Sequence, residues 1–511
     1  MNSRVTGYAT IVVACLAQLI VTVDMTVLHL AAPALSVQLG ASSVSMLWIV
    51  DVYGFTMAGL LVTLGNLGDR IGRRRMLMWG VSAFAVASVL AAYAPTVELL
   101  IIARALLGVA GAAILPATTS LLRVVFTTQK ARTAAVGASA GFSAAGFAVG
   151  PIVGGVLLNQ FWWGSVFLVN VPILLLVLVA VRFIPESRAP QRIPLDLPSV
   201  LLSVIGVVAV VYTIKGAFFV GPWHLDVMAA FVVGVLALWL FARRQRQLPV
   251  PLIDLRLFQR RQFATSVGSN LVAVFTLTAF GLIISQYFQV VREWTPLNAG
   301  IAYVPGAVAA VLAGGVLAAT AINKIGRGSS VALGLVLAAI GFGLLARVEA
   351  DSSYALVVVA QIAVGAGAGL TLTVTSDTIL GTVPRDRSGA AAAISVTAYE
   401  LGGSLGIAII GTVLSGIYRA QLVLPEGVPQ SVVEQVRESF SAAVGSGLAE
   451  PLATAVRTAA TEAYLDGIRT SMAFSAAVTV ILALFVLKFL RGVPKVLDQE
   501  PAQEESSTRG A

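Results

Sequence analysis

The chain has 511 residues, of which 58% are hydrophobic and only 11% are charged, and its mean hydropathy is +0.92. An average soluble domain carries about 25% charged residues, so a water-soluble fold is excluded. Lys and Arg outnumber Asp and Glu by 33 to 24. In so apolar a protein this excess indicates cytoplasmic loops rather than binding of nucleic acid.

Charge-poor tracts recur along the chain, and each is long enough to cross a hydrocarbon layer about 30 Å thick as a helix. The pattern predicts an all-α polytopic membrane protein. The first tract lacks a small-residue cleavage site, so we expect it to remain as a span. It holds the single cysteine, Cys15, so no intramolecular disulfide can form. We predict fourteen spans, at residues 8–30, 44–66, 76–94, 97–121, 133–158, 164–184, 198–220, 225–242, 264–289, 298–321, 329–346, 354–380, 388–418 and 467–490.

The basic residues predict the orientation of these spans. An even number of spans places both termini on one side of the membrane. The segments on that side, tails included, hold 25 Lys and Arg residues, whereas the opposite segments hold six. By the positive-inside rule, both termini are therefore expected in the cytoplasm.

Two connecting segments depart from short loops. Residues 243–262 are rich in Arg, and we expect an amphipathic connector along the inner leaflet that anchors the topology. In the outer segment 419–466, Val432, Val436 and Phe440 repeat at helical spacing, and a second apolar repeat follows. This pattern predicts a hairpin of two short helices that caps the exit, and an irregular loop is the alternative.

The two halves of the sequence align at an offset of 254 to 256 residues. Gly72-Arg73 falls on Gly326-Arg327, and Asp69 falls on Asn323. Spans 1–6 thus correspond to spans 9–14, and parallel repeats of this kind are typical of transporters. The predicted parts are an N-terminal six-helix bundle at 1–184, an insert with the connector at 185–262, a C-terminal six-helix bundle at 263–491 and a polar cytoplasmic tail at 492–511.

Four motifs carry a resemblance to a known family. Residues 65–75 resemble the loop signature of the major facilitator superfamily, and Arg104 begins a stretch similar to its second motif. Residues 141–155 resemble its antiporter motif. Residues 23–33 resemble the first-span signature of the fourteen-helix drug:proton antiporter family, which includes the QacA-like and LfrA-like multidrug efflux pumps. That signature often has Asn where this chain has His29, a difference expected to affect local hydrogen bonding and substrate range.

The loop between spans 2 and 3 is expected to act as a charged latch. Its glycines permit a tight turn, and we expect Asp69 to accept hydrogen bonds from the N–H groups that open span 3. Because Asn323 stands at the matching position, only the first half is expected to have a charged latch. The resemblance implies that the latch stabilises the outward-facing state. Its predicted members are Gly65, Asp69, Arg70, Gly72 and Arg73.

Span 5 carries small residues at helical spacing around one proline. Such residues let another helix approach closely, which is ordinary packing in membrane proteins. The resemblance implies in addition a tightly packed seam that limits proton leakage. The antiporter motif comprises Gly146, Gly150, Pro151, Gly154 and Gly155.

Acidic residues inside spans are the strongest functional signal. Each costs at least ~2.5 kcal/mol near the bilayer centre, so it normally faces a cavity and has a function. Asp24 and Glu400 fall near the middle of the membrane, one in each half, and either can hold a proton and a cationic drug in turn. A structural hydrogen bond to a neighbouring helix is the alternative. Two further candidates are Asp51, expected within reach of outer solvent, and Asp377, which can instead reach inner water or Arg385.

Arg104 is the only arginine well inside a span, and its permanent charge requires a carboxylate or dipole partner. We expect it to support proton relay electrostatically. His29 is a candidate proton shuttle, with a neutral, hydrogen-bonded histidine as the alternative. Aromatic faces can hold a delocalised cation, although most membrane aromatics only pack. The candidates are Trp48, Tyr53, Phe142 and Tyr399.

These features predict a proton-coupled multidrug efflux antiporter. It would export amphipathic, mainly cationic compounds, such as dyes, quaternary ammonium compounds and antibiotics, by alternating access. No Gly-x4-Gly-Lys-Ser/Thr loop occurs, which argues against an ATP-driven pump. We expect no enzymatic activity, cofactor, metal or nucleic-acid partner. The expected state is a monomer, and the resemblance implies the cytoplasmic (inner) membrane of a bacterium.

Two other functions fit the same scaffold. One is an exporter specific for a single natural product or lipid, which only substrate profiling separates from a multidrug pump. The other is a membrane sensor, which would need a large cytosolic domain, whereas the tail at 492–511 is short and polar.

Overall fold

The computed structural model describes residues 3–126, 128–188, 196–219, 221–249, 251, 255–382, 388–438, 440, 443 and 448–490. Helices and their connections make up these segments, and no strand occurs in them. The all-α prediction is therefore confirmed.

A helix, or a run of consecutive helices, occupies each predicted span. The first half consists of α1 (Ser3–Gln38), α2 (Ser43–Ile71), α3 (Arg73–Ala92), α4 (Val97–Val125), α5 (Gln129–Gln160), α6 (Ser165–Leu168) and α7 (Asn170–Val181). Next come α8 (Leu197–Phe219) and α9 (Leu225–Gln247). The second half consists of η1 (Leu255–Gln259), α10 (Arg261–Gln286), η2 (Tyr287–Val291), α11 (Pro296–Leu312), η3 (Ala313–Leu317), α12 (Ala318–Ile325), α13 (Arg327–Leu345), α14 (Tyr354–Gly381), α15 (Ser388–Gln421), α16 (Gln430–Glu438) and α18 (Leu452–Phe489).

Among the described residues, eleven helices are long and apolar enough to cross a membrane, or twelve if the bent α2 is a single span. Two shorter apolar helices, Val149–Gln160 and Ser165–Val181, lie within predicted spans 5 and 6. The count of fourteen spans, the side of the termini and the domain boundaries therefore stay predictions.

Hydroxyl side chains fix where several helices begin. Ser42, Thr96, Thr295 and Ser353 each precede a helix and accept a hydrogen bond from a backbone N–H group of its first turn. Each cap satisfies a donor that the helix itself leaves unpaired. All four caps lie at the end of the bundle where α1 ends and α2 begins. We call this end the outer end, after the orientation that the basic residues predict.

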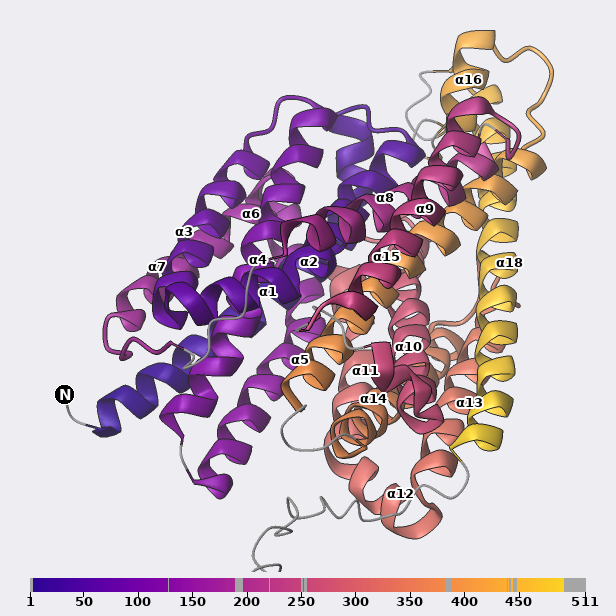
Figure 1. Ribbon diagram of the computed structural model, residues 1–511. Coiled ribbons are helices and arrows are strands. Elements are labelled where there is room, and N and C mark those ends of the chain that lie inside the picture. The colour runs from indigo at the N-terminus through magenta and orange to yellow at the C-terminus, as the bar shows by residue number, and fades with distance from the viewer. Residues whose placement is uncertain are drawn as a thin grey trace, which may run out of the picture.

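Two apolar cores lie side by side. One is formed by α1–α4, α6 and α7, and the other by α10, η2, α11, α13–α16 and α18. Figure 1 shows the first half at the left and the second at the right, with α8 and α9 crossing between them. The α8 helix packs on both halves, against α2 and α15.

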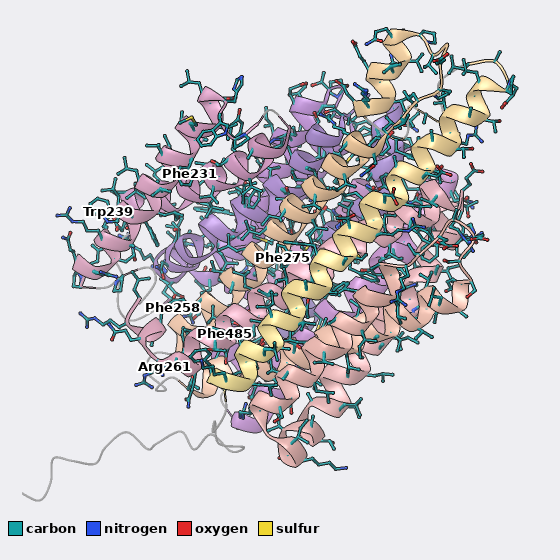
Figure 2. The ribbon with its side chains drawn as sticks, turned by 90° about the vertical axis from the view of Figure 1, so that its right-hand side faces the viewer. Phe231, Trp239, Phe258, Arg261, Phe275 and Phe485 are labelled. Carbon is teal, nitrogen blue, oxygen red and sulfur yellow. The ribbon has the colours of Figure 1, made fainter. Side chains whose placement is uncertain are left out.

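The surface of α9 has the character of a lipid-facing helix. Figure 2 shows Phe231 and Trp239 along α9 pointing away from the rest of the molecule. Both side chains are more than half exposed. An exposed apolar face of this extent suits a hydrocarbon environment rather than water.

The two halves meet toward the outer end. The α5 helix packs on α11 there, so that a Cβ atom on Gly155 would lie 2.7 Å from the Cα atom of Leu297. The α2 helix packs on α15, where Leu47 fills the space beside Gly411. The α1 helix contacts α10. We call these three contacts the outer seam, and they hold the molecule together at its outer end.

The outer hairpin differs from its prediction. The first short helix exists as α16, and the hydroxyl of Tyr418 on α15 donates a hydrogen bond of 2.7 Å to the carbonyl of Val436. The second is not separate, because its residues form the outer part of the 38-residue helix α18. The prediction of two short helices is therefore wrong in its second part. The hairpin rests on the second half, at the top of Figure 1.

The basic connector is anchored at its α9 end. The guanidinium of Arg244 donates to Asp196 just before α8, with an Nη2–Oδ1 distance of 2.7 Å. This guanidinium lowers the pKa of the Asp196 carboxyl below its usual range. On the other side of the connector, Arg260 donates to the carbonyl of Thr382 at 2.8 Å. The position of the connector along the inner leaflet stays a prediction.

Candidate functional site

A buried ion pair lies in the middle of the first half. Arg104 on α4 donates from Nη1 to Oδ2 of Asp24 on α1 at 2.6 Å. The two side chains are 1% and 0% exposed. The expectation that Arg104 needs a carboxylate partner is therefore met by Asp24, across 80 residues of sequence.

Three further groups hold this pair in place. The other carboxylate oxygen of Asp24 accepts a hydrogen bond of 2.9 Å from Nδ2 of Asn170 on α7. The Nε atom of Arg104 donates to the carbonyl of Ile49 on α2 at 3.1 Å, and its guanidinium carbon lies 4.5 Å from the ring centroid of Tyr53. The pair thus joins four helices of the first half, and protonation of Asp24 would remove one of its two charges.

Two residues of this network, Asn170 and Ser88, were not predicted. Asn170 is an amide within an otherwise apolar span, a signal that could have drawn attention to it. It also lies 3.4 Å from the hydroxyl of Ser88 on α3. Tyr53 was predicted as a substrate aromatic, but its ring is buried against Arg104, so it is not accessible to substrate in this state.

The other predicted carboxylates occupy different environments. Asp51 on α2 is fully buried, so the expectation that outer solvent reaches it is wrong. Residue Glu400 belongs to α15, whose next residues Gly402 and Gly403 pack against α10. The side chain of Glu400 lies outside the described part of the structure, and its role stays a prediction.

Asp377 belongs to an ion pair at the inner end of the second half. Its carboxylate is 59% exposed and accepts a hydrogen bond of 2.6 Å from Nη1 of Arg327, which also contacts the hydroxyl of Thr378. Arg327 is the counterpart of Arg73 in the sequence repeat. The expectation that only the first latch is charged is therefore wrong, because the second half draws its carboxylate from α14.

The first latch is built differently from its prediction. Asp69 accepts a hydrogen bond of 2.6 Å from the side chain of Arg73 and not from the N–H groups that open α3. Those groups are capped by Glu186, which follows α7 and accepts from the backbone of Arg74 at 3.1 Å and of Arg75 at 3.3 Å. Glu186 is thus a member of the latch that was not predicted from the sequence.

Two glycines let the latch form. Gly72 has a φ of 121°, and a Cβ atom there would lie 2.5 Å from the carboxylate of Glu186. Gly65 lies against Pro116 of α4. Arg70, in the last turn of α2, suits the negative end of the helix dipole. The loop between α2 and α3 is thus tied to the segment after α7.

We expect Gly72→Ala to destabilise the protein more than Gly326→Ala does. Both positions have a positive φ, which costs a non-glycine residue about 1–3 kcal/mol. Only at Gly72 would the new methyl group also displace Glu186, since nothing lies within 4 Å of a Cβ atom at Gly326. Thermal unfolding of the purified variants measures the difference. Equal shifts in unfolding temperature would contradict a Glu186 cap.

The antiporter motif packs on both sides of α5. Gly146, Gly150 and Gly154 lie against α1, so closely that a Cβ atom at any of them would contact Thr22, Thr26 or Val27. On another face, Gly155 and the carbonyl of Pro151 meet α11 across the outer seam. Close packing is therefore present on the face toward α1 and on the face toward the second half.

The remaining candidates differ in exposure and in their neighbours. His29 on α1 faces the second half and is 5% exposed. Trp48 lies beside Tyr212 of α8, with ring centroids 6.4 Å apart. Phe142 on α5 is 44% exposed, and Tyr399 on α15 is half-buried. The role of these aromatic residues in binding substrate stays a prediction.

The fold and these motifs define a two-halved membrane transporter. Residues 14–407 match the Major Facilitator Superfamily. The chain belongs to this superfamily.

Its relatives carry names of drug efflux or of resistance to a toxic compound. It is 39% identical over 483 residues to the multidrug efflux pump LfrA of Mycolicibacterium smegmatis, covering 94% of this chain and 95% of that protein. It is 36% identical to the methyl viologen resistance protein SmvA of Salmonella typhimurium, covering 94% and 97% of the two chains. The family resemblance read from the motifs is confirmed.

A solved structure shares the fold. It is a bacterial homologue of the human lysosomal transporter Spinster, crystallised in an inward-facing and occupied conformation. The TM-score is 0.67 at 15% identity, covering 95% of this chain and 96% of the other. The likeness extends over nearly the whole of both chains and supports the major facilitator fold.

Proposed function

We propose that the protein exports amphipathic, mainly cationic compounds in exchange for protons, by alternating access in the cytoplasmic membrane of a bacterium. The observation that carries the proposal is the buried Asp24–Arg104 pair. A buried carboxylate that has a cationic partner is a group whose protonation changes the packing around it. Relatives described as a multidrug efflux pump and a methyl viologen resistance protein support the export of drugs, and methyl viologen is itself a dication.

The contacts of Arg104 suggest how a proton changes the conformation. Protonation of Asp24 leaves the guanidinium with the carbonyl of Ile49 and the ring of Tyr53, both on α2. Leu47, two residues before Ile49 and six before Tyr53 on the same helix, packs against Gly411 in the outer seam. A shift of Arg104 is therefore transmitted along α2 to the contact between the halves. The populations of the states with the outer seam open and closed would then depend on whether Asp24 is protonated, as coupling requires.

Everted membrane vesicles test this function. Their acidified interior corresponds to the outer side, so a proton-driven exporter accumulates ethidium inside, and a protonophore abolishes the accumulation. We expect the Asp24→Asn and Glu400→Gln variants to lose this accumulation, because each lacks a carboxylate that exchanges a proton for a cation. Normal transport by both variants under an imposed pH gradient would contradict the proposed mechanism.

A narrow-specificity exporter is the second candidate. It is favoured by the description of SmvA, which names resistance to one compound. Cells that express the protein distinguish the two when challenged with several unrelated cations, such as ethidium, methyl viologen and a quaternary ammonium detergent. Protection against all of them supports a multidrug exporter, whereas protection against a single compound supports the narrow alternative.

A further inference from the structure

His29 inserts into the second half at the outer seam. A Cβ atom on Gly281 of α10 would lie 3.2 Å from Nδ1 of His29 and 2.8 Å from the hydroxyl oxygen of Tyr303 on α11. A Cβ atom at this point would therefore crowd both the imidazole and the tyrosine hydroxyl, and the glycine avoids this crowding. The hydroxyl of Ser285, one turn further along α10, donates a hydrogen bond of 3.1 Å to the carbonyl of His29.

The imidazole is buried there without full hydrogen bonding. His29 is 5% exposed, and its Nε2 atom has no hydrogen-bond partner among the residues that the structure describes. The alternative prediction was a neutral histidine whose ring nitrogens are hydrogen-bonded. The Nε2 atom does not fit this alternative. A protonated imidazole has two N–H donors, so the cation would be buried at this seam with a donor left over. Burying such a charge is costly, and a closed seam thus favours the neutral form.

The α1 helix carries two proton-binding side chains on different faces. Asp24 points to Arg104 and Asn170 within the first half. His29, five residues later, meets α10 and α11 of the second half. The carboxylate therefore responds to the core of the first half, whereas the imidazole responds to whether the two halves touch.

The other titratable groups near this contact are few. The helices α6 and α7 contain none, and neither do residues 149–160 of α5 and 263–286 of α10. The other elements that pack against α1 near its outer end carry the following titratable groups: Asp51 and Tyr53 of α2, Glu98 and Arg104 of α4, Tyr287 of η2 and Tyr303 of α11.

We propose that His29 is a further proton-binding site of the transport cycle, beside the carboxylates, and that it binds its proton from the outer side only when the outer seam is open. The proposal rests on the proposed function, because it assumes that the seam opens and closes during transport. A proton on His29 then opposes closure, since closing would bury the charge between α1 and α10. Acid on the outer side thus holds the open state until His29 releases its proton.

The distance between the halves at the outer end tests this proposal. Spin labels at Val37 on α1 and Val423 just after α15 report it, because both side chains are strongly exposed and belong to different halves. The labelled protein carries Cys15→Ser, is held in lipid nanodiscs and is measured by pulsed dipolar spectroscopy without drug or gradient. A water-exposed imidazole passes from about 90% protonated at pH ~5.5 to about 3% at pH ~8. We expect the long-distance population to fall over the same range.

Three variants decide the outcome. His29→Asn, the residue that the family signature often carries, should abolish this pH response. Ser285→Ala is the matched control, because it removes a seam hydrogen bond and keeps the imidazole, so the response should persist. Gly281→Ala crowds the imidazole and should raise the open population at every pH. A His29→Asn protein with the wild-type response would overturn the proposal. If the wild-type protein shows the pH response but accumulates no dye in vesicles, the result contradicts the proposed function and not the role of His29. The two outcomes can be told apart because the distance measurement needs no transport.

Discussion

Asp24→Asn is expected to lose proton-driven dye efflux and to unfold at a lower temperature. The substitution leaves Arg104, which is 1% exposed, without its anionic partner. Removing one member of a buried pair costs about 3 kcal/mol or more, a difference of roughly 100-fold in an equilibrium or a rate. Initial rates of dye transport in proteoliposomes and thermal unfolding of the purified protein measure the two effects.

Two controls separate the loss of the proton site from a general loss of stability. Ser88→Ala removes a contact to Asn170 and leaves both oxygens of Asp24 bonded, so transport should remain near wild type. The double variant Asp24→Asn/Arg104→Met removes both charges and should regain part of the lost stability while transport stays absent. Wild-type transport by the single Asp24→Asn variant would contradict a role of this carboxylate in coupling.

Gly155→Ala and Gly300→Ala are expected to block transport by preventing closure of the outer seam. A methyl group at Gly155 would lie 2.7 Å from the Cα atom of Leu297, and one at Gly300 would fall on the carbonyl of Pro151. These are backbone atoms, which cannot yield as the end of a side chain does. Overpacking costs about 1–3 kcal/mol, and about 1.4 kcal/mol corresponds to a tenfold change in rate. We therefore expect the transport rate to fall by about tenfold or more.

Gly268→Ala on α10 is the matched control for these two variants. Nothing lies within 4 Å of a Cβ atom at Gly268, so transport should be unchanged. A cysteine introduced at Leu47 reports the seam directly, because it is buried beside Gly411 when the seam is closed. In the Gly155→Ala background it should react faster with a membrane-impermeant maleimide. Unaltered reactivity and transport would show that the seam tolerates the added methyl group.

The fold was predictable because its signals are local. Charge-poor tracts mark the spans, and each predicted span coincides with helical structure in the described residues. The outer part of α18 was misread because a charge-bearing stretch separates the apolar repeat before residue 467 from the final span. Helical hydrogen bonds continue through that stretch, since charged side chains at its surface do not interrupt a helix.

The site was only partly predictable because its pairings are long-range. The need of Arg104 for a partner follows from its charge and its depth, but four candidate carboxylates were available. Only the packing of α1 on α4 selects Asp24. The alignment of Asp69 with Asn323 misled in the same way, since the carboxylate of the second latch comes from Asp377 on another helix.

The central claim is that the carboxylates inside the spans exchange protons for cations. The release of protons when a drug binds tests this claim most directly. Ethidium is added to the purified wild-type protein in weakly buffered detergent solution, and the pH of the solution is followed. We expect the wild-type protein to release protons in a saturable manner, and the Asp24→Asn and Glu400→Gln variants to release fewer. Saturable ethidium binding by the wild-type protein with no change in pH would contradict the exchange.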